Sequence, residues 1–432
     1  MAATEGPRDL PGSAGDYSMS ISVNLLEATA DSVGVPAANG QDGYGYNGNR
    51  VITFPVPPGE TYIRWKDTHV LFTVSSTGSL GDQRRLSAAG SAALIERGRF
   101  RVQGGRILEQ VDSMNLISSI MALFYTDQWK YGAGRRFGYG TDLQRAADML
   151  FNSGGTVGKR MELDLLAMGI VKTGRSFPNF AVGWAFEFQL ADPRDAMVCD
   201  FVGATAPNYA VDNAQMYITQ VTGTAMLDEQ IYGMWNAGLP ITVPFEHQYY
   251  FPQTISVGDQ LVQKNFAIAR DQVILYRCRF SLVSDFSNYL VDLHQFGVNP
   301  GINYNHLQIG GQLIPASQIE WQGDGCENLY TMHDAMYLGN VPLSAPLDSD
   351  AFYQNPPVGG VPVNASQTLI TIGLGGGRDA GIRAGLNLNL GNSGAYLRLA
   401  LLGQLTAAVH MTQIVTAILH LNISNNDALV VG

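Results

Sequence analysis

Charged side chains are scarce in this sequence, lysine above all. Only 15% of the 432 residues are Asp, Glu, Lys or Arg, whereas soluble chains carry about a quarter. The lysines stand alone at positions 66, 130, 159, 172 and 264, no run of Lys and Arg occurs, and the formal net charge is −11. Because neutralising a phosphate backbone needs clustered basic side chains, we expect no direct binding to nucleic acid. The low charge also indicates that much of the surface is buried in large interfaces.

Cysteine is nearly absent, and no C-x-x-C pattern occurs. Cys199, Cys278 and Cys326 are far apart in the sequence. Isolated cysteines of this kind are typical of small buried hydrophobic residues in a reducing compartment. A single disulfide remains the alternative.

Patterns for metal binding and catalysis are missing as well. The seven histidines form no pair at ligand spacing, and no paired carboxylates, nucleophile elbow or phosphate-binding loop is present. Glycines follow a strand in ITIGLGGGRDAG (370–381), but the next segment alternates like a strand, whereas a nucleotide-binding turn must open a helix. We therefore predict no catalytic residue, no cofactor, no metal ligand and no enzyme activity.

Two further segments bear on localisation. Residues 1–20 are rich in Gly and Pro and have no apolar core, so we expect a flexible N-terminal arm and no secretory signal. The longest apolar stretch (399–423) is interrupted by Gln404, His410, Gln413 and His420. We interpret it as buried strands rather than as a membrane span.

Glycine, proline and aromatic residues are plentiful, as in proteins of short strands and turns. A hairpin pattern occurs twice, as FRVQGGRIL (100–108) and LQIGGQLIP (307–315). Gly104–Gly105 and Gly310–Gly311 supply the positive φ angles of two-residue type I′ turns. Two weaker echoes follow in the same order, residues 115–125 with 328–337 and residues 218–227 with 411–421. The sequence thus predicts a tandem duplication, with domains at 21–235 and 236–432 after the arm.

The expected elements are mostly strands. Alternating patterns predict strands at 50–57, 60–76, 159–171, 180–191, 216–227 and 272–284. Helices are predicted at 113–125 and from Thr141, where Thr141 and Gln144 fit a capping box. The domain boundary falls near 234–245, where Gly and Pro concentrate. The fold class is therefore all-β, with two tandem eight-stranded antiparallel units, sandwiches or jelly rolls, and short helices in long loops.

Three segments resemble a known family. They are ETYIRWKDTHVLFTVSS (60–76), NYNHLQIGGQLIP (303–315) and AYLRLALLGQLTAAVHMTQIVTAILHLNI (395–423). Together they resemble the double jelly-roll major capsid proteins of tailless icosahedral double-stranded DNA viruses. The likeness is greatest to the Polinton, virophage and adintovirus branch of the adenovirus hexon lineage. In this family acidic or leucine residues are common at the positions that Trp65 and Lys66 occupy in this sequence.

The resemblance implies a virion protein whose chains form homotrimers, pseudo-hexagonal capsomers that tile an icosahedral shell. Its implied partners are further copies of itself, penton proteins and minor capsid or cement proteins. The N-terminal arm would lie inside, where it could contact an internal membrane. Other β-sandwich virion components, such as a spike or penton, are the alternative, followed by a cupin-like or carbohydrate-active enzyme. The internal duplication argues against a penton, which usually has a single jelly roll. The enzymes would need clustered metal ligands or paired carboxylates, and the sequence shows neither.

Overall fold

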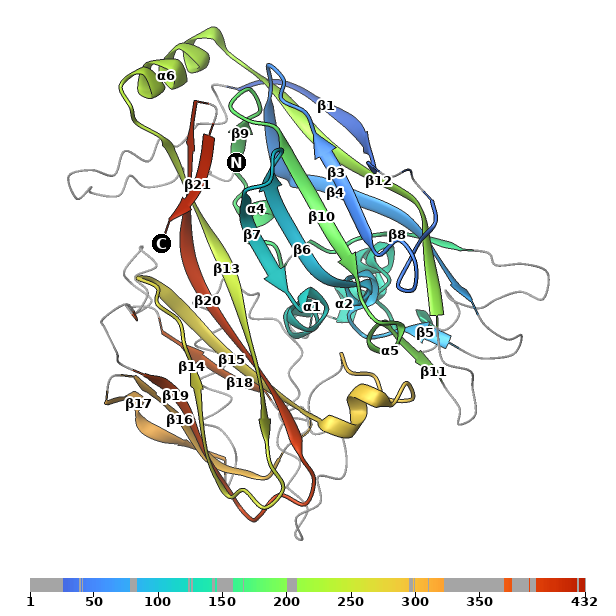
Figure 1. Ribbon diagram of the computed structural model, residues 1–432, viewed down its shortest axis with the longest axis vertical. Coiled ribbons are helices and arrows are strands. Elements are labelled where there is room, and N and C mark those ends of the chain that lie inside the picture. Colours follow the sequence, from blue (N-terminus) through green and yellow to red (C-terminus); the bar gives the residue numbers. More distant parts are fainter. Residues whose placement is uncertain are drawn as a thin grey trace.

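The computed structural model describes most of the chain in two strand-rich units. The described residues are 26–38, 40, 42–77, 84–122, 125, 127–141, 144–145, 158–165, 167–199, 208–294, 298, 300–309, 311–321, 369–374, 388, 394–425 and 427–431. Strands β1 to β12 form one set of antiparallel sheets, here called unit 1, and β13 to β21 form a second set, unit 2 (Figure 1). Within these residues no helix is long and apolar enough to cross a membrane.

Unit 1 contains two facing sheets and a short ribbon. The first sheet has the order β1 (Leu26–Pro36), β12 (Asn208–Gly223), β4 (Tyr62–Thr77) and β8 (Lys159–Glu162), with β2 (Tyr44–Gly45) on β12 and β9 (Ser176–Pro178) on β4. The second has the order β3 (Val51–Val56), β10 (Trp184–Leu190), β6 (Ile95–Val102) and β7 (Ile107–Asp112). The ribbon pairs β5 (Arg84–Leu86) with β11 (Met197–Cys199).

Unit 2 repeats this strand order. Its first sheet runs β13 (Ile241–Ile255), β20 (Val409–Ser424), β15 (Val273–Leu282) and β18 (Leu369–Gly373), with β21 (Asp427–Val431) on β20. Its second runs β14 (Leu261–Phe266), β19 (Ala395–Leu401), β16 (Ile302–Ile309) and β17 (Gln312–Glu320). Two four-stranded sheets with these crossovers make an eight-stranded jelly roll. The chain is therefore a double jelly roll, as predicted, and the two hairpins β6–β7 and β16–β17 occupy the same place in their sheets.

Short helices lie in the connections. They are α1 (Met114–Ala122), α2 (Asp127–Tyr131), α4 (Gly169–Lys172), α5 (Pro193–Ala196), α6 (Ala225–Asn236) and the 3-10 turns η2 (Gly90–Leu94), η3 (Ala133–Phe137) and η4 (Val283–Ser287). Helix α1 confirms the helix predicted at 113–125. The Thr141 and Gln144 capping box is also present, with backbone-to-side-chain bonds of 3.1 and 3.2 Å in both directions. Most of the helix it was expected to start lies outside the described residues.

Two predicted strands were too long. The strand at 216–227 ends at Gly223, because the Thr224 hydroxyl accepts a bond from Leu227 N (3.3 Å) and starts α6. The strand at 159–171 stops at Glu162, and its last residues form α4 instead. The boundary region 234–245 therefore contains the end of a helix and the start of β13. We keep the domain division at residue 235 as a proposal, since the sheets change there.

Some predictions fall outside the described residues: the N-terminal arm (1–20), the helical echo at 328–337, Cys326, and the glycines that follow β18. Cys199 and Cys278 are both buried, and neither forms a disulfide among the described residues. This agrees with buried hydrophobic cysteines at these two positions.

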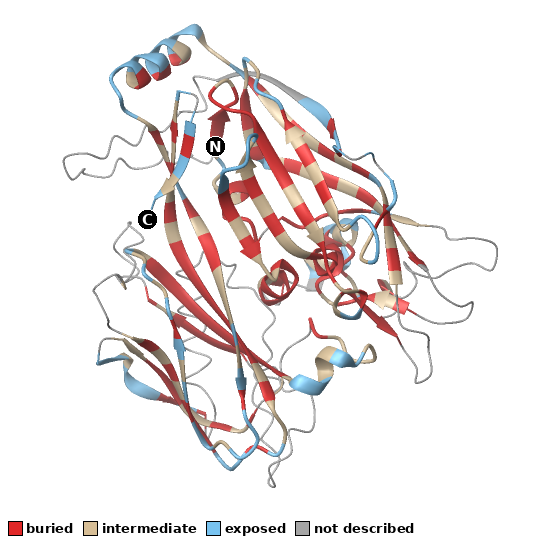
Figure 2. Cartoon of the chain, viewed as in Figure 1, coloured by how far each residue is buried: buried red, intermediate tan, exposed pale blue. Residues whose placement is uncertain are grey.

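Alternating burial builds the core of unit 1. Figure 2 shows buried and half-buried residues alternating along the strands, and β3 follows this pattern without a break. At its centre the fully buried Trp65 ring has edge-on contacts with Phe100, Phe177, Trp184 and Phe186, at centroid distances of 5.2 to 6.3 Å. The residue that departs from the resembled pattern is thus the hub of an aromatic cluster.

We expect Trp65→Ala to lower the free energy of unfolding by about 4 kcal/mol, because it empties a large part of this cluster. Trp65→Phe should cost clearly less. The indole N–H of Trp65 has no hydrogen-bond partner among the described residues, so its removal loses no bond. Chemical denaturation of both variants measures the difference, and equal losses would contradict the packing role.

Candidate functional site: the seam between the two jelly rolls

The two jelly rolls meet along a shared apolar core. This contact, here called the seam, joins β7, α1 and α4 of unit 1 to β13, β15, β20 and β21 of unit 2. The same buried cluster that fills unit 1 includes these residues of unit 2: Ile241, Val243, Phe245, Ile414, Leu419, Leu421, Ile423 and Ala428. The Trp235 indole of α6 donates to the Ile423 carbonyl at 3.2 Å. The seam is thus mainly apolar, with a few polar groups inside it.

Glu109 of β7 is the most enclosed carboxylate of the seam, with only 2% of its surface exposed. Its two oxygens accept the backbone N–H groups of Gly169 (2.7 Å) and Ile170 (3.1 Å) in α4. His247 Nδ1 of β13 lies 3.5 Å from the same carboxylate. Gly169 is needed there, because a Cβ atom would lie 1.6 Å from the Glu246 carbonyl oxygen. One carboxylate therefore holds together β7, α4 and β13.

A buried ion pair joins the units at a second point. Arg145 and Asp292 are 3.2 Å apart, and each side chain is only 3% exposed. Asp292 also accepts the backbone N–H of Ala88 at 2.9 Å, and Arg145 donates to the Leu86 carbonyl at 2.7 Å. Since both charges have further hydrogen-bond partners, part of their desolvation cost is offset.

Next to this pair lie His294 and Arg279, both buried. Arg279 of β15 donates to the Ser119 hydroxyl of α1 at 3.1 Å and to the Leu293 carbonyl. Burial lowers the pKa of Arg279 to about 10. Burial, together with the positive charges of Arg279 and Arg145, lowers the pKa of His294 to about 3. The imidazole of His294 is therefore neutral at physiological pH.

At the rim of the seam, Arg106 and Asp427 form an ion pair of 2.6 Å between the β6–β7 connection and β21. Their side chains are 50% and 55% exposed. Exposed pairs of this kind contribute about 0–1 kcal/mol, so the rim adds little to the stability of the seam.

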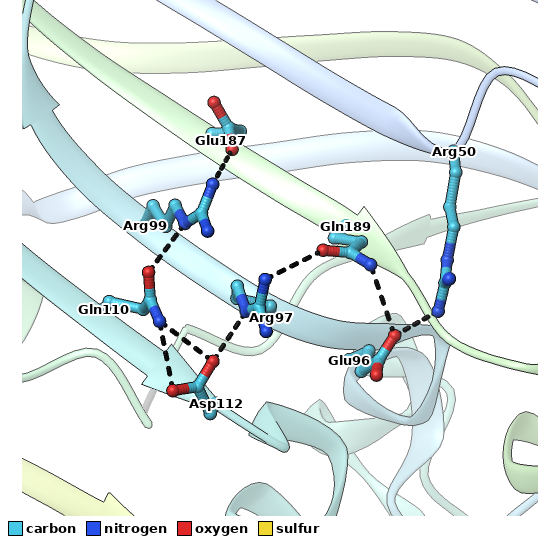
Figure 3. A network of polar contacts seen from close by, with 8 residues as sticks. All are labelled: Arg50, Glu96, Arg97, Arg99, Gln110, Asp112, Glu187 and Gln189. Carbon is cyan, nitrogen blue, oxygen red and sulfur yellow. Dashed lines mark hydrogen bonds and ion pairs between the residues drawn. The ribbon is translucent and has the colours of Figure 1, made fainter. Parts of the chain in front are cut away.

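The outer face of the β3–β10–β6–β7 sheet carries a connected polar network. Figure 3 shows it running from Glu187 through Arg99, Gln110, Asp112, Arg97, Gln189 and Glu96 to Arg50. The arginines of β6 alternate along one face and each has an acidic neighbour, with Arg99–Glu187 at 2.8 Å and Arg97–Asp112 at 2.6 Å. The arginines on this face are not consecutive in the sequence, so no basic cluster was predicted here. The i, i+2 spacing of Arg97, Arg99 and Arg101 was the signal for it.

Three of the four glycines that were predicted to form turns lie among the described residues, at the β6–β7 and β16–β17 connections. Gly104 and Gly105 have positive φ angles of 141° and 123°. Val102 N donates to Arg106 O (2.9 Å) and Gly105 N donates to Val102 O (3.0 Å), so the turn contains the three residues 103–105 and is longer than the predicted two-residue turn. In the second hairpin Ile309 pairs with Gln312, which leaves two turn positions, and Gly311 has φ 89°. Gly310 is outside the described residues.

No catalytic geometry is evident in the described part of the chain. None of its His, Cys, Asp and Glu side chains gather in groups of three that could hold a metal ion. The absence of enzyme activity, cofactor and metal remains a prediction.

Comparison with known proteins identifies relatives by fold only. No family model matches the sequence, and no curated protein matches it significantly. A chain from the structure of the Sputnik virophage is similar, with a TM-score of 0.60, 11% identity and coverage of 100% of this chain and 93% of that one. The Faustovirus major capsid protein has a TM-score of 0.58 and 9% identity, with coverage of 96% of this chain and 93% of that one. A PBCV-1 virus capsid chain has a TM-score of 0.56 and 13% identity, with coverage of 96% of this chain and 100% of that one. The double jelly-roll fold of these proteins extends over nearly the whole chain.

We expect Glu109→Ala to destabilise the protein by about 3 kcal/mol, because two buried backbone N–H groups lose their acceptor. Asp427→Ala is the matched control at the rim and should cost at most about 1 kcal/mol. Urea denaturation measures both. Similar losses for the two variants would show that Glu109 is not a central contact.

The lowered pKa of His294 predicts that the stability of the folded protein depends on pH. Its pKa is about 3 in the folded protein and about 6.5 when unfolded. Between these values the unfolded chain binds a proton that the folded chain does not, so stability is lost as the pH falls from about 6.5. Urea denaturation at pH 7 and pH 5 should show a smaller decrease for His294→Gln than for the wild type. An unchanged decrease would contradict this assignment.

Proposed function

We propose that this protein is a major capsid protein, the structural subunit of an icosahedral virus shell. The observation that carries the proposal is the exact repetition of one jelly-roll strand order in two units of a single chain. Two similar chains of comparable length are named as a virus capsid and as a major capsid protein. The function requires rigid sandwiches and association surfaces, and it requires no active site.

Three chains per capsomer is the assembly that we propose. Two jelly rolls in each of three chains give six similar units, which can tile a shell as a hexagonal block. A closed ring also limits association to a defined size before the shell forms. Exposed apolar side chains, among them Leu261 (76%), Val257 (60%) and Met226 (54%), provide surface that association could cover.

Its partners would be further capsomers, penton proteins and minor capsid or cement proteins. We propose no enzyme activity and no direct binding to nucleic acid. On the outer face of β6 the arginines are paired with carboxylates, so this cluster offers little free positive charge for phosphates. Contact of the N-terminal arm with an internal membrane is a further part of the proposal.

Light scattering and negative-stain microscopy of the purified protein test the assembly. We expect particles of about three times 46.7 kDa, with a hexagonal outline, or whole shells. Five-fold rings would indicate a penton instead. A stable monomer at micromolar concentration would count against a capsid role altogether, because apolar surface would then have no partner.

A further inference from the structure

Strand β15 carries two arginines on the face that it turns toward unit 1. Arg277 and Arg279 are two residues apart, so their side chains leave the strand on the same side, because side chains alternate along a strand. Tyr276, Cys278 and Phe280 point to the other side and belong to the core of unit 2. Arg277 is only 5% exposed and Arg279 only 3%. Two guanidinium groups are therefore enclosed between the units.

Arg277 has no partner for its charge among the described residues. It lies opposite Thr371 of β18 and Ile414 of β20, and Ile414 belongs to the buried cluster that fills unit 1. Arg277 Nη1 and Thr371 Oγ1 are both buried without a hydrogen-bond partner in the described part of the chain. Burial alone lowers the pKa of Arg277, to about 10. The guanidinium therefore stays charged at neutral pH, and no described carboxylate lies near enough to oppose the shift.

Arg279 donates only to neutral groups. Its hydrogen bonds go to the Ser119 hydroxyl at 3.1 Å and to the Leu293 carbonyl, and its Nε has no partner among the residues that the structure describes. The charge of Asp292 raises the pKa of Arg279, but the oxygens of this carboxylate bond to other groups. Arg279 is thus a second buried cation without an anion in contact with it.

The buried charges around β15 do not balance. Asp292 accepts hydrogen bonds from Arg145 at 3.2 Å and from the backbone N–H groups of Ala88 at 2.9 Å and His294 at 3.0 Å. The other carboxylate that acts on Arg279 is the half-buried Asp285. Three guanidinium groups therefore face two carboxylates within the described residues. Water can bond to a buried N–H group but cannot neutralise a buried charge, which is very unfavourable unless it is paired.

We infer that Arg277, Arg279 and Thr371 bind a small inorganic anion with one negative charge, a halide such as chloride, between the two jelly rolls. Guanidinium N–H and threonine O–H groups are the donors that such an anion accepts. Because the three residues are at most 5% exposed, a large organic anion cannot reach them, and the ion enters as the two units close on each other. The bound anion stabilises the seam by supplying the missing negative charge. The site lies within one chain and does not depend on the proposed function.

Urea denaturation at constant ionic strength tests the anion. Sodium chloride is replaced stepwise by sodium gluconate, whose anion is too large for the closed site. We expect the urea midpoint of the wild type to rise with the chloride fraction, because a ligand that binds only the folded state stabilises it. Arg277→Met should show no such rise. The matched control, Arg106→Met, removes an exposed arginine at the rim of the seam and should keep the wild-type response.

Anomalous X-ray diffraction of wild-type crystals grown in bromide locates the ion. We expect a bromide peak between the Arg277 and Arg279 side chains, and no peak there in Arg277→Met. A water molecule at this place, or bromide at the molecular surface only, would overturn the inference. A wild-type midpoint that does not depend on chloride, or that depends on it as strongly in Arg277→Met, would overturn it as well. If Arg277→Met does not fold, the presence or absence of the bromide peak in the wild type decides.

Discussion

Strands β13 and β20 serve two cores at once, and the arrangement of the two jelly rolls depends on this. Ile241 and Phe245 of β13 belong to the core of unit 1, whereas Ile255, further along the same face, belongs to the core of unit 2. A 15-residue strand spans roughly 50 Å, so it extends well beyond the sandwich to which it is paired. The first part of β13 therefore lies in the seam, while its end lies in the core of unit 2.

An apolar contact alone would leave the position along β13 poorly defined, because hydrophobic attraction has no direction. The surroundings of Glu109 define this position more narrowly. Its two oxygens meet two particular N–H groups, of Gly169 and Ile170, and Gly169 touches the β13 backbone at Glu246. A slide of β13 by one residue would move His247 away from this carboxylate and bring a different backbone group against Gly169, whereas the Gly169 and Ile170 donors belong to unit 1 and would stay in place. The close approach at Gly169 and the buried pairs Glu109–His247 and Arg145–Asp292, which cross between the units, therefore favour one register among those that the apolar surfaces would accept.

Much of the fold could be predicted from local patterns. The alternation of apolar and polar residues predicted the strands near 51–56 and 62–77, because alternate residues of a strand face the core. The two Gly-Gly hairpins indicated the duplication. The predicted strands at 216–227 and 159–171 were too long for a physical reason. Thr224 ends the first by capping α6, and α4 forms where Gly169 fits against another strand, a constraint that local sequence does not contain.

The seam could not be predicted, because its contacts join residues far apart in the chain. Glu109 and His247 are 138 residues apart, and Arg145 and Asp292 are 147 apart. Each looks like an ordinary polar residue of a strand or a loop. Duplication can be read from a sequence because both copies keep the pattern that builds the sandwich. The faces that meet are determined by residues such as Glu109 and Phe245, whose contacts with the other unit cannot be inferred from the local pattern of their own strand.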